Sequence, residues 1–184
     1  DHGGFTENID DRIASVAHWL KSTSPNLTEA EAFEIAKSHM ATLPISFVAD
    51  FKEVLDNPEV TVLKIFAMGQ IDDPALLSAK EELLQIPNLA VTSSGANNIE
   101  VNHEAAQKGQ SLQKVTELLN LPLSKVAALG DNFNDMSMIA AAGIGIAMAN
   151  AEDEVKAIAK YTTVTNIENG VAHAVECILA GEWQ

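Results

Sequence analysis

Short apolar runs alternate with longer helix-favouring segments from about residue 100 to the end of the chain. The apolar runs have the length of buried strands, and each is separated from the next by a segment long enough for a helix. Such alternation with short connections is typical of parallel strands in a doubly wound α/β layer. The elements expected here are, in order, helix 110–119, strand 126–129, helix 136–142, strand 144–147, helix 152–160, strand 161–164 and helix 171–179.

The first half of the chain has a less regular α/β pattern. Residues 9–21 place four apolar side chains on one helical face, and Thr28 with Glu31 forms a capping box that opens a helix toward Met40. Further elements expected are strand 60–68, a helix from Asp72 to about residue 84, and strands 89–93 and 98–101. The two patterns predict a first domain over residues 1–99 and a second over residues 100–184.

Composition narrows the class of protein. A chain of 184 residues with 47% hydrophobic residues can bury one large core or two small ones. A formal net charge of -15 argues against nucleic acid and anionic membrane surfaces as partners. The single cysteine, Cys177, excludes an internal disulfide and favours the cytoplasm. No apolar run approaches the roughly 20 residues of a membrane span.

The strongest chemical signal is the stretch Gly130-Asp131-Asn132-Phe133-Asn134-Asp135, directly after the strand expected at 126–129. Ligands of open α/β sheets bind at the carboxyl ends of the strands. Two carboxylates placed there favour a bound cation, and hard oxygen ligands suit Mg²⁺. The alternative is a solvated, Asn-rich turn with an Asp capping the next helix, and the residue types alone leave both open.

The order of residues in this stretch adds a resemblance. The pattern Gly-Asp-x-x-Asn-Asp-x-x-Met includes Gly130 and Met138, and Lys108-Gly109 lies 23 positions before Asp131. On these residues, and on the closing segment Glu168-Asn169-Gly170-Val171, the chain resembles the haloacid dehalogenase-like (HAD) hydrolases, in particular the Cof-type sugar-phosphate phosphatases. The resemblance extends from about residue 91 to 179 and is weaker before. It implies part of a doubly wound, Rossmann-like parallel core at 100–184 and an α/β cap domain at 1–99, incomplete at its start.

The resemblance also implies roles for four residues. Asp131 would be a Mg²⁺ ligand, and Asp135 would hold a metal-bound water or orient the loop. Asn134 would contact the phosphate or the metal shell, and Lys108 would be the catalytic cation that binds the phosphate. Taken alone, Lys108 would be read as an exposed surface lysine; the acidic loop in register downstream favours the phosphate-binding role instead. The expected ligand is a small phosphorylated metabolite such as a sugar phosphate.

One element of the family pattern is missing. HAD phosphatases carry an aspartate nucleophile in an Asp-x-Asp loop, and this chain contains no Asp-x-Asp. Thr92-Ser93-Ser94 could be the family's Ser/Thr loop, although its position favours a cap strand. We therefore expect a C-terminal fragment of a Mg²⁺-dependent phosphatase, inactive alone, whose core is completed by a preceding segment or by homo-oligomerisation. The alternative is a non-catalytic binding module that retains the fold.

Overall fold

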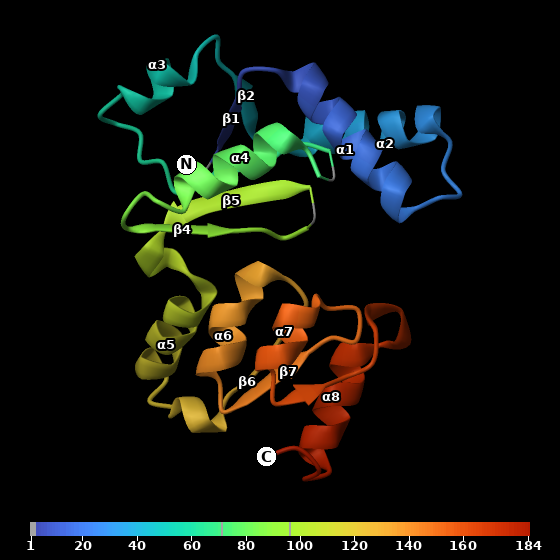
Figure 1. The fold of residues 1–184 in the computed structure, drawn as a ribbon, viewed down its shortest axis with the longest axis vertical. Coiled ribbons are helices and arrows are strands. Elements are labelled where there is room, and N and C mark those ends of the chain that lie inside the picture. Colours follow the sequence, from blue (N-terminus) through green and yellow to red (C-terminus); the bar gives the residue numbers. More distant parts are fainter. Residues whose placement is uncertain (1–2, 71, 96) are drawn as a thin grey trace. The chain divides into compact units, whose positions relative to one another are not determined.

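The computed structural model describes residues 3–70, 72–95 and 97–184 (Figure 1). The chain divides into two compact units, one of residues 3–63 and 68–70 and one of residues 64–67 and 72–184. The division of roles between residues 1–99 and 100–184 stays a prediction, because compactness alone does not assign a role to either part.

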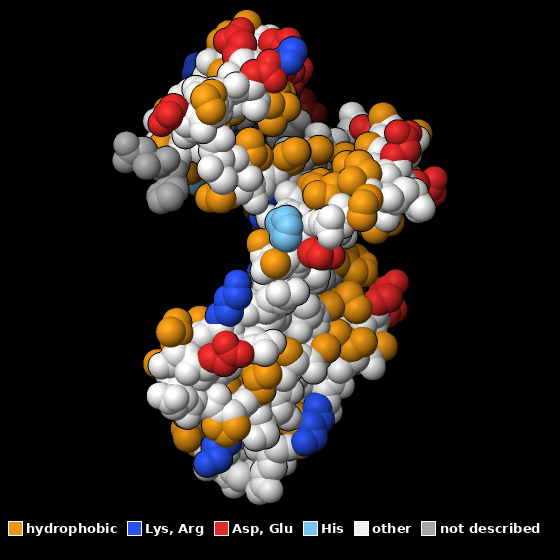
Figure 2. Space-filling model, turned by 90° about the vertical axis from the view of Figure 1, so that its left-hand side faces the viewer, with side chains coloured by type: hydrophobic (Ala, Val, Ile, Leu, Met, Phe, Trp, Pro, Cys, Tyr) orange, Lys and Arg blue, Asp and Glu red, His pale blue; other side chains and the backbone are white. Residues whose placement is uncertain are grey.

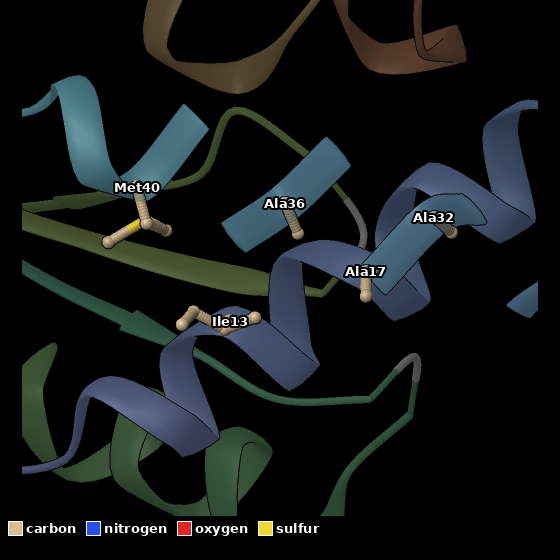
Figure 3. Packing of buried hydrophobic residues seen from close by; sticks show 5 residues of the cluster. All are labelled: Ile13, Ala17, Ala32, Ala36 and Met40. Atoms are coloured by element: carbon tan, nitrogen blue, oxygen red, sulfur yellow. The ribbon is translucent and has the colours of Figure 1, made fainter. Parts of the chain in front are cut away.

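The first unit is built on two packed helices. Helix α1 (Ile9–Thr23) begins after Asn8, whose side chain accepts from a backbone N–H, and α2 (Glu29–Thr42) begins with the capping box expected at Thr28. The two helices bury a common core (Figure 3), in which Ala32 and Ala36 are fully buried and lie one turn apart. The small side chains let the helices approach closely. The core cluster is Ile13, Ala17, Ala32, Ala36 and Met40.

Three short elements of this unit were not predicted. Strand β1 (Gly4–Thr6) pairs in parallel with β2 (Ile45–Phe47), and α3 (Phe51–Leu55) follows. Each spans between three and five residues, which is too short for an apolar period to stand out.

The second unit contains an antiparallel pair within a three-stranded sheet. The strand order is β3 (Ile65–Met68), β5 (Asn98–His103) and β4 (Leu89–Thr92), and β4 runs antiparallel to β5. Helix α4 (Pro74–Leu83), capped by Asp73, contacts β4 and β5. The strand expected at 60–68 is wrong for residues 60–64, which have no regular structure. An apolar run forms a strand only where a neighbouring strand takes its backbone hydrogen bonds.

The rest of the second unit confirms the expected parallel α/β layer. The strands β6 (Ala127–Gly130), β7 (Ile144–Ala147) and β8 (Tyr161–Thr162) are neighbours in that order and all parallel. Helices α6 (Met136–Ala141) and α7 (Asp153–Ile158) lie side by side against the sheet (Figure 1). The helices of this layer are α5 (Lys108–Leu118), α6 (Met136–Ala141), α7 (Asp153–Ile158) and α8 (Gly170–Leu179). Four 3-10 turns join the elements: η1 (Glu104–Ala106), η2 (Leu123–Lys125), η3 (Phe133–Asp135) and η4 (Asn166–Glu168).

Packing in this layer is tight between the sheet and its helices. Ile139 of α6, Ala147 of β7 and Val155 of α7 belong to one buried cluster. Strand β6 pairs with β7 along one edge, and no strand of the described ranges pairs with its other edge. The segment or second copy expected to complete the core therefore stays a prediction.

The surface is mixed in character. Apolar side chains reach it in several places, as the orange areas of Figure 2 show. Among the described residues, no helix combines the length and apolar character that crossing a membrane requires.

Candidate active site

The acidic loop begins where β6 ends and leads through η3 into α6. Its first residue, Gly130, has to be glycine, because an added Cβ would lie 2.3 Å from Cβ of Asp135. Without a side chain at Gly130, the Asp135 carboxylate can fold back beneath the start of the loop. The sequence therefore places both carboxylates of the loop at the carboxyl edge of the parallel sheet.

Asp135 holds the loop in shape. Its Oδ2 accepts hydrogen bonds from the backbone N–H groups of Asp131 at 3.0 Å and Asn132 at 3.2 Å. Its Oδ1 accepts from the ammonium group of Lys108. The side chain is 8% exposed, so these three donors offset much of the cost of burying its charge. Of the two roles expected for Asp135, this geometry favours orienting the loop.

Lys108 reaches Asp135 because α5 packs closely against α6. An added Cβ at Gly109 would lie 2.4 Å from the carbonyl oxygen of Ser137, and the Gly109 N–H donates to Ser137 Oγ at 3.0 Å. This close approach fixes the start of α5 beside the acidic loop. The Lys108 side chain remains 49% exposed, so its ammonium group has donors left for a ligand.

Asp131 is held less completely than Asp135. Within the described ranges, one side-chain bond reaches its carboxylate, from Asn150 Nδ2 to Oδ2 at 3.2 Å. Asn150 also accepts from the backbone N–H of Asn166 at 2.9 Å. Asn150 follows β7 and Asn166 follows β8, so one amide links the segments after all three parallel strands. Sequence reasoning missed Asn150, although its place just after an expected strand was a usable signal.

Asn134 joins the acidic loop to the β4–β5 turn. Its backbone N–H donates to the carbonyl of Ser93 at 3.2 Å. Thr92 ends β4 as a strand residue, and Ser93 and Ser94 directly follow it. The structure thus places the Thr92-Ser93-Ser94 stretch beside the acidic loop through a backbone contact.

Glu100 of β5 is a second buried carboxylate near this loop, and sequence reasoning missed it. Its oxygens accept from Lys64 Nζ at 2.7 Å and from Ser94 Oγ at 2.6 Å. Burial raises the pKa of the Glu100 carboxyl. The hydrogen bonds from Lys64 and Ser94 and the charge of Lys64 outweigh burial, with a smaller contribution from the Asn134 side chain, so the pKa lies below its ordinary value of 4.5.

A cavity of about 230 Å³ opens between these groups. Lys108, Asn134 and Ser137 line one part of it, and side chains of β4 and β5 line another. Its volume is below the roughly 300–1,000 Å³ typical of pockets for drug-sized ligands. The cavity therefore suits a small ligand.

The carboxylates fit a magnesium ion that takes few protein ligands. Within the described ranges, no group of three or more His, Cys, Asp or Glu side chains could hold a metal ion. Mg²⁺ commonly takes one or two carboxylates and completes its shell with water and phosphate oxygens. Asp131, with one hydrogen bond on its carboxylate, has the acceptor capacity that such an ion needs.

Phosphatases of Bacillus subtilis are similar to this chain in sequence. A phosphatase of Bacillus subtilis named 5-amino-6-(5-phospho-D-ribitylamino)uracil phosphatase YwtE is 34% identical over 164 residues, which cover 89% of this chain and 57% of the relative. A second B. subtilis phosphatase with the same named substrate, YcsE, is 47% identical over 104 residues, covering 56% of this chain and 42% of the relative. The chain thus spans about half the length of these relatives.

The fold is also found in a solved structure. A haloacid dehalogenase-like hydrolase from B. subtilis superposes with a TM-score of 0.80 at 29% identity, covering 94% of this chain and 61% of the other. The sequence profile described as haloacid dehalogenase-like hydrolase matches residues 15–175. With most of its length matched, the chain belongs to the haloacid dehalogenase-like hydrolases.

Proposed function

We propose that this chain supplies the phosphate- and metal-binding part of a Mg²⁺-dependent phosphatase that acts on small phosphorylated metabolites. The observation that carries the proposal is the meeting of Lys108 with the acidic loop at the carboxyl edge of a parallel sheet. A cation, a carboxylate with free acceptor capacity and an amide lie on neighbouring segments there. Together they match the charges of a phosphate and its metal ion.

Each side chain has a distinct part in this proposal. Asp131 binds Mg²⁺, and Asp135 keeps the loop and Lys108 in place. Lys108 donates to phosphate oxygens and stabilises the negative charge that spreads over them during transfer. Asn134 donates its side-chain amide to the phosphate. When bound, Mg²⁺ offsets the repulsion between a phosphate ester and an attacking carboxylate.

The nucleophile is not among the residues of this site. Covalent phosphoryl transfer needs an attacking group, and no Asp-x-Asp occurs in the sequence. We therefore propose that the chain binds metal and phosphate but does not turn over by itself. Positioning groups cannot replace the atom that forms the bond.

The named substrate of the two relatives suggests a substrate class. Both are named for an ester in which phosphate is carried by a ribityl chain. A phosphate on a small hydroxyl-bearing carbon chain also fits the volume of the cavity beside Lys108. We propose this class, which includes sugar phosphates, for the present chain.

Calorimetry of Mg²⁺ and inorganic phosphate tests the binding part of the proposal. Asp131→Asn should weaken Mg²⁺ binding about 10-fold or more, because one carboxylate ligand is lost. Asp153→Asn is the matched control, since the Asp153 side chain is 99% exposed and lies at the start of α7. Equal Mg²⁺ affinity in the two variants and the native chain would contradict the metal site.

Turnover is tested with an aryl phosphate, with and without Mg²⁺, on this chain and on a form extended at its amino end. We expect activity only in the extended form. Activity of the short chain that Asp131→Ala abolishes would show that the nucleophile lies within these residues. An extended form that lacks Asp-x-Asp and stays inactive would favour a non-catalytic binding module.

A further inference from the structure

One face of the β4–β5 pair forms a polar wall of the cavity. The register pairs Ala90 with Asn102 and Thr92 with Glu100. Residues opposite each other in an antiparallel pair point to the same face, and so do residues two apart in one strand. All four side chains line the cavity that Lys108 also lines. A hydroxyl, an amide and a carboxylate therefore face the ligand space beside the phosphate-binding lysine.

The carboxylate in this wall is fixed before any ligand arrives. Glu100 is buried, with 8% of its side chain exposed; one oxygen accepts from Lys64 and the other from Ser94, and the Asn134 side chain makes a smaller contribution. Each carboxylate oxygen can accept a further hydrogen bond. A buried carboxylate held by two donors is pre-organised, so a ligand hydroxyl that donates to it does not have to order it first.

Lys64 contributes a hydrogen-bond donor to the same wall, where Glu100 contributes an acceptor. Lys64 lines the cavity, its side chain is 45% exposed, and its ammonium group uses one of its three donors on Glu100. The charges of Lys64 and Glu100 offset each other, so this wall has no net positive charge to attract a second anionic group of the ligand. A neutral chain of hydroxyl groups, each both a donor and an acceptor, matches it better.

We propose that Glu100 is a specificity-determining residue that accepts a hydrogen bond from a hydroxyl group of the alcohol portion of the phosphate ester. Lys64 and Asn102 provide donors to neighbouring hydroxyl oxygens on the same wall. The inference rests on the proposed function, because it assumes that the phosphate lies at Lys108. The inference adds to that function the residues that would distinguish a polyhydroxylated phosphate ester from a plain alkyl one.

The test compares two ligands in the presence of Mg²⁺, ribitol 5-phosphate and methyl phosphate, by calorimetry. The native chain should bind ribitol 5-phosphate about 10-fold or more tightly than methyl phosphate, since only the former can donate a hydroxyl hydrogen bond to the charged Glu100 carboxylate. Glu100→Gln should remove about 10-fold of the affinity for ribitol 5-phosphate and change that for methyl phosphate less than about 2-fold. Glu104→Gln is the control, because Glu104 is an exposed residue of η1 near the same strand.

A second variant protects the test against misfolding of Glu100→Gln. Asn102→Ala removes a partly exposed side chain of the same wall and should weaken ribitol 5-phosphate alone, by about 3- to 10-fold. Thermal unfolding followed by circular dichroism shows whether each variant is folded. Equal losses for both esters, or no loss for either, would overturn the role of Glu100.

The outcomes also separate this inference from the function on which it rests. Methyl phosphate binding that Lys108→Met abolishes supports the phosphate site. With that result in hand, equal affinity of the native chain for the two esters overturns the inference alone. If neither ester binds, both the proposed function and this inference are overturned.

Discussion

The ammonium group of Lys108 meets the carboxylate of Asp135, a residue 27 positions further along the chain. Asp135 in turn accepts from two backbone N–H groups of its own loop. The cation and the shape of the acidic loop are therefore coupled through one side chain. Replacing either partner should affect both ligand binding and stability.

Lys108→Met should weaken binding of inorganic phosphate by about 10- to 100-fold, because a charge-assisted donor is lost. It should also lower the free energy of unfolding by about 1–2 kcal/mol, less than for a fully buried pair because the lysine is half exposed. Calorimetry and denaturant unfolding measure the two effects. Lys114→Met, on an exposed position of the same helix, should change neither; an equal effect of both variants would contradict a specific role for Lys108.

Gly109→Ala should destabilise the second unit. The new Cβ would lie 2.4 Å from a backbone carbonyl oxygen of α6, which cannot move aside as a flexible side chain would. Overpacking of this kind costs about 1–3 kcal/mol, and here it would also push Lys108 away from Asp135. Hydrogen exchange of the amides in α5 and α6 would report the loosened contact.

The control for Gly109→Ala is Gly4→Ala in β1. A Cβ there would make an ordinary contact at 3.4 Å, so we expect little change in stability. Unaltered exchange in α5 and α6 of Gly109→Ala would show that the two helices have room to separate.

The lowered pKa of Glu100 makes the stability of the fold depend on pH in the acid range. Its folded pKa lies below the ordinary value of 4.5 because the bonds from Lys64 and Ser94 outweigh the opposing effect of burial. A carboxyl with a lowered folded pKa contributes stability that is present above its unfolded pKa and is lost as the pH falls through its folded pKa. The free energy of unfolding should therefore fall below about pH 4.5, and Glu100→Gln should make that fall shallower.

Denaturant unfolding of the native chain and Glu100→Gln between about pH 6 and pH 3 checks this expectation. Asp56→Asn is the control, since Asp56, at the end of α3, pairs with Lys52, and both side chains are more than half exposed. Parallel pH profiles for the native chain and Glu100→Gln would contradict the lowered pKa.

The longer helices of both units and the parallel layer were predictable because each of these elements carries its own local signal. Thr28 and Glu31 mark the start of α2, and Ile144–Ala147 has both the apolar character and the length of the strand found there. Residues 60–64 show where this reasoning fails. They have strand-forming side chains and no strand, because pairing depends on a partner that a local pattern does not contain.

The residues of the candidate site likewise fall into those that the sequence predicted and those that it did not. Asp131, Asn134 and Asp135 stood out because they are clustered in sequence, and the spacing of Lys108 from them matched a known pattern. Glu100 could not be singled out, since it is an isolated polar residue whose importance comes from what the fold brings against it. Asn150 follows an expected strand, which was a usable signal, but its contact with Asp131 comes from the fold. The alternative of a freely solvated turn loses support where Asp135 is buried with three donors.

The position of Asn150 makes the site sensitive to deamidation of this one side chain. Its side-chain amide donates to Asp131 and accepts from the backbone of Asn166, and the residue is exposed to water. Hydrolytic deamidation would turn that donor into a carboxylate facing the carboxylate of Asp131, and two like charges so close repel each other. Slow chemical damage at a single surface position would in this way reach the centre of the proposed phosphatase site and change its preference for cations.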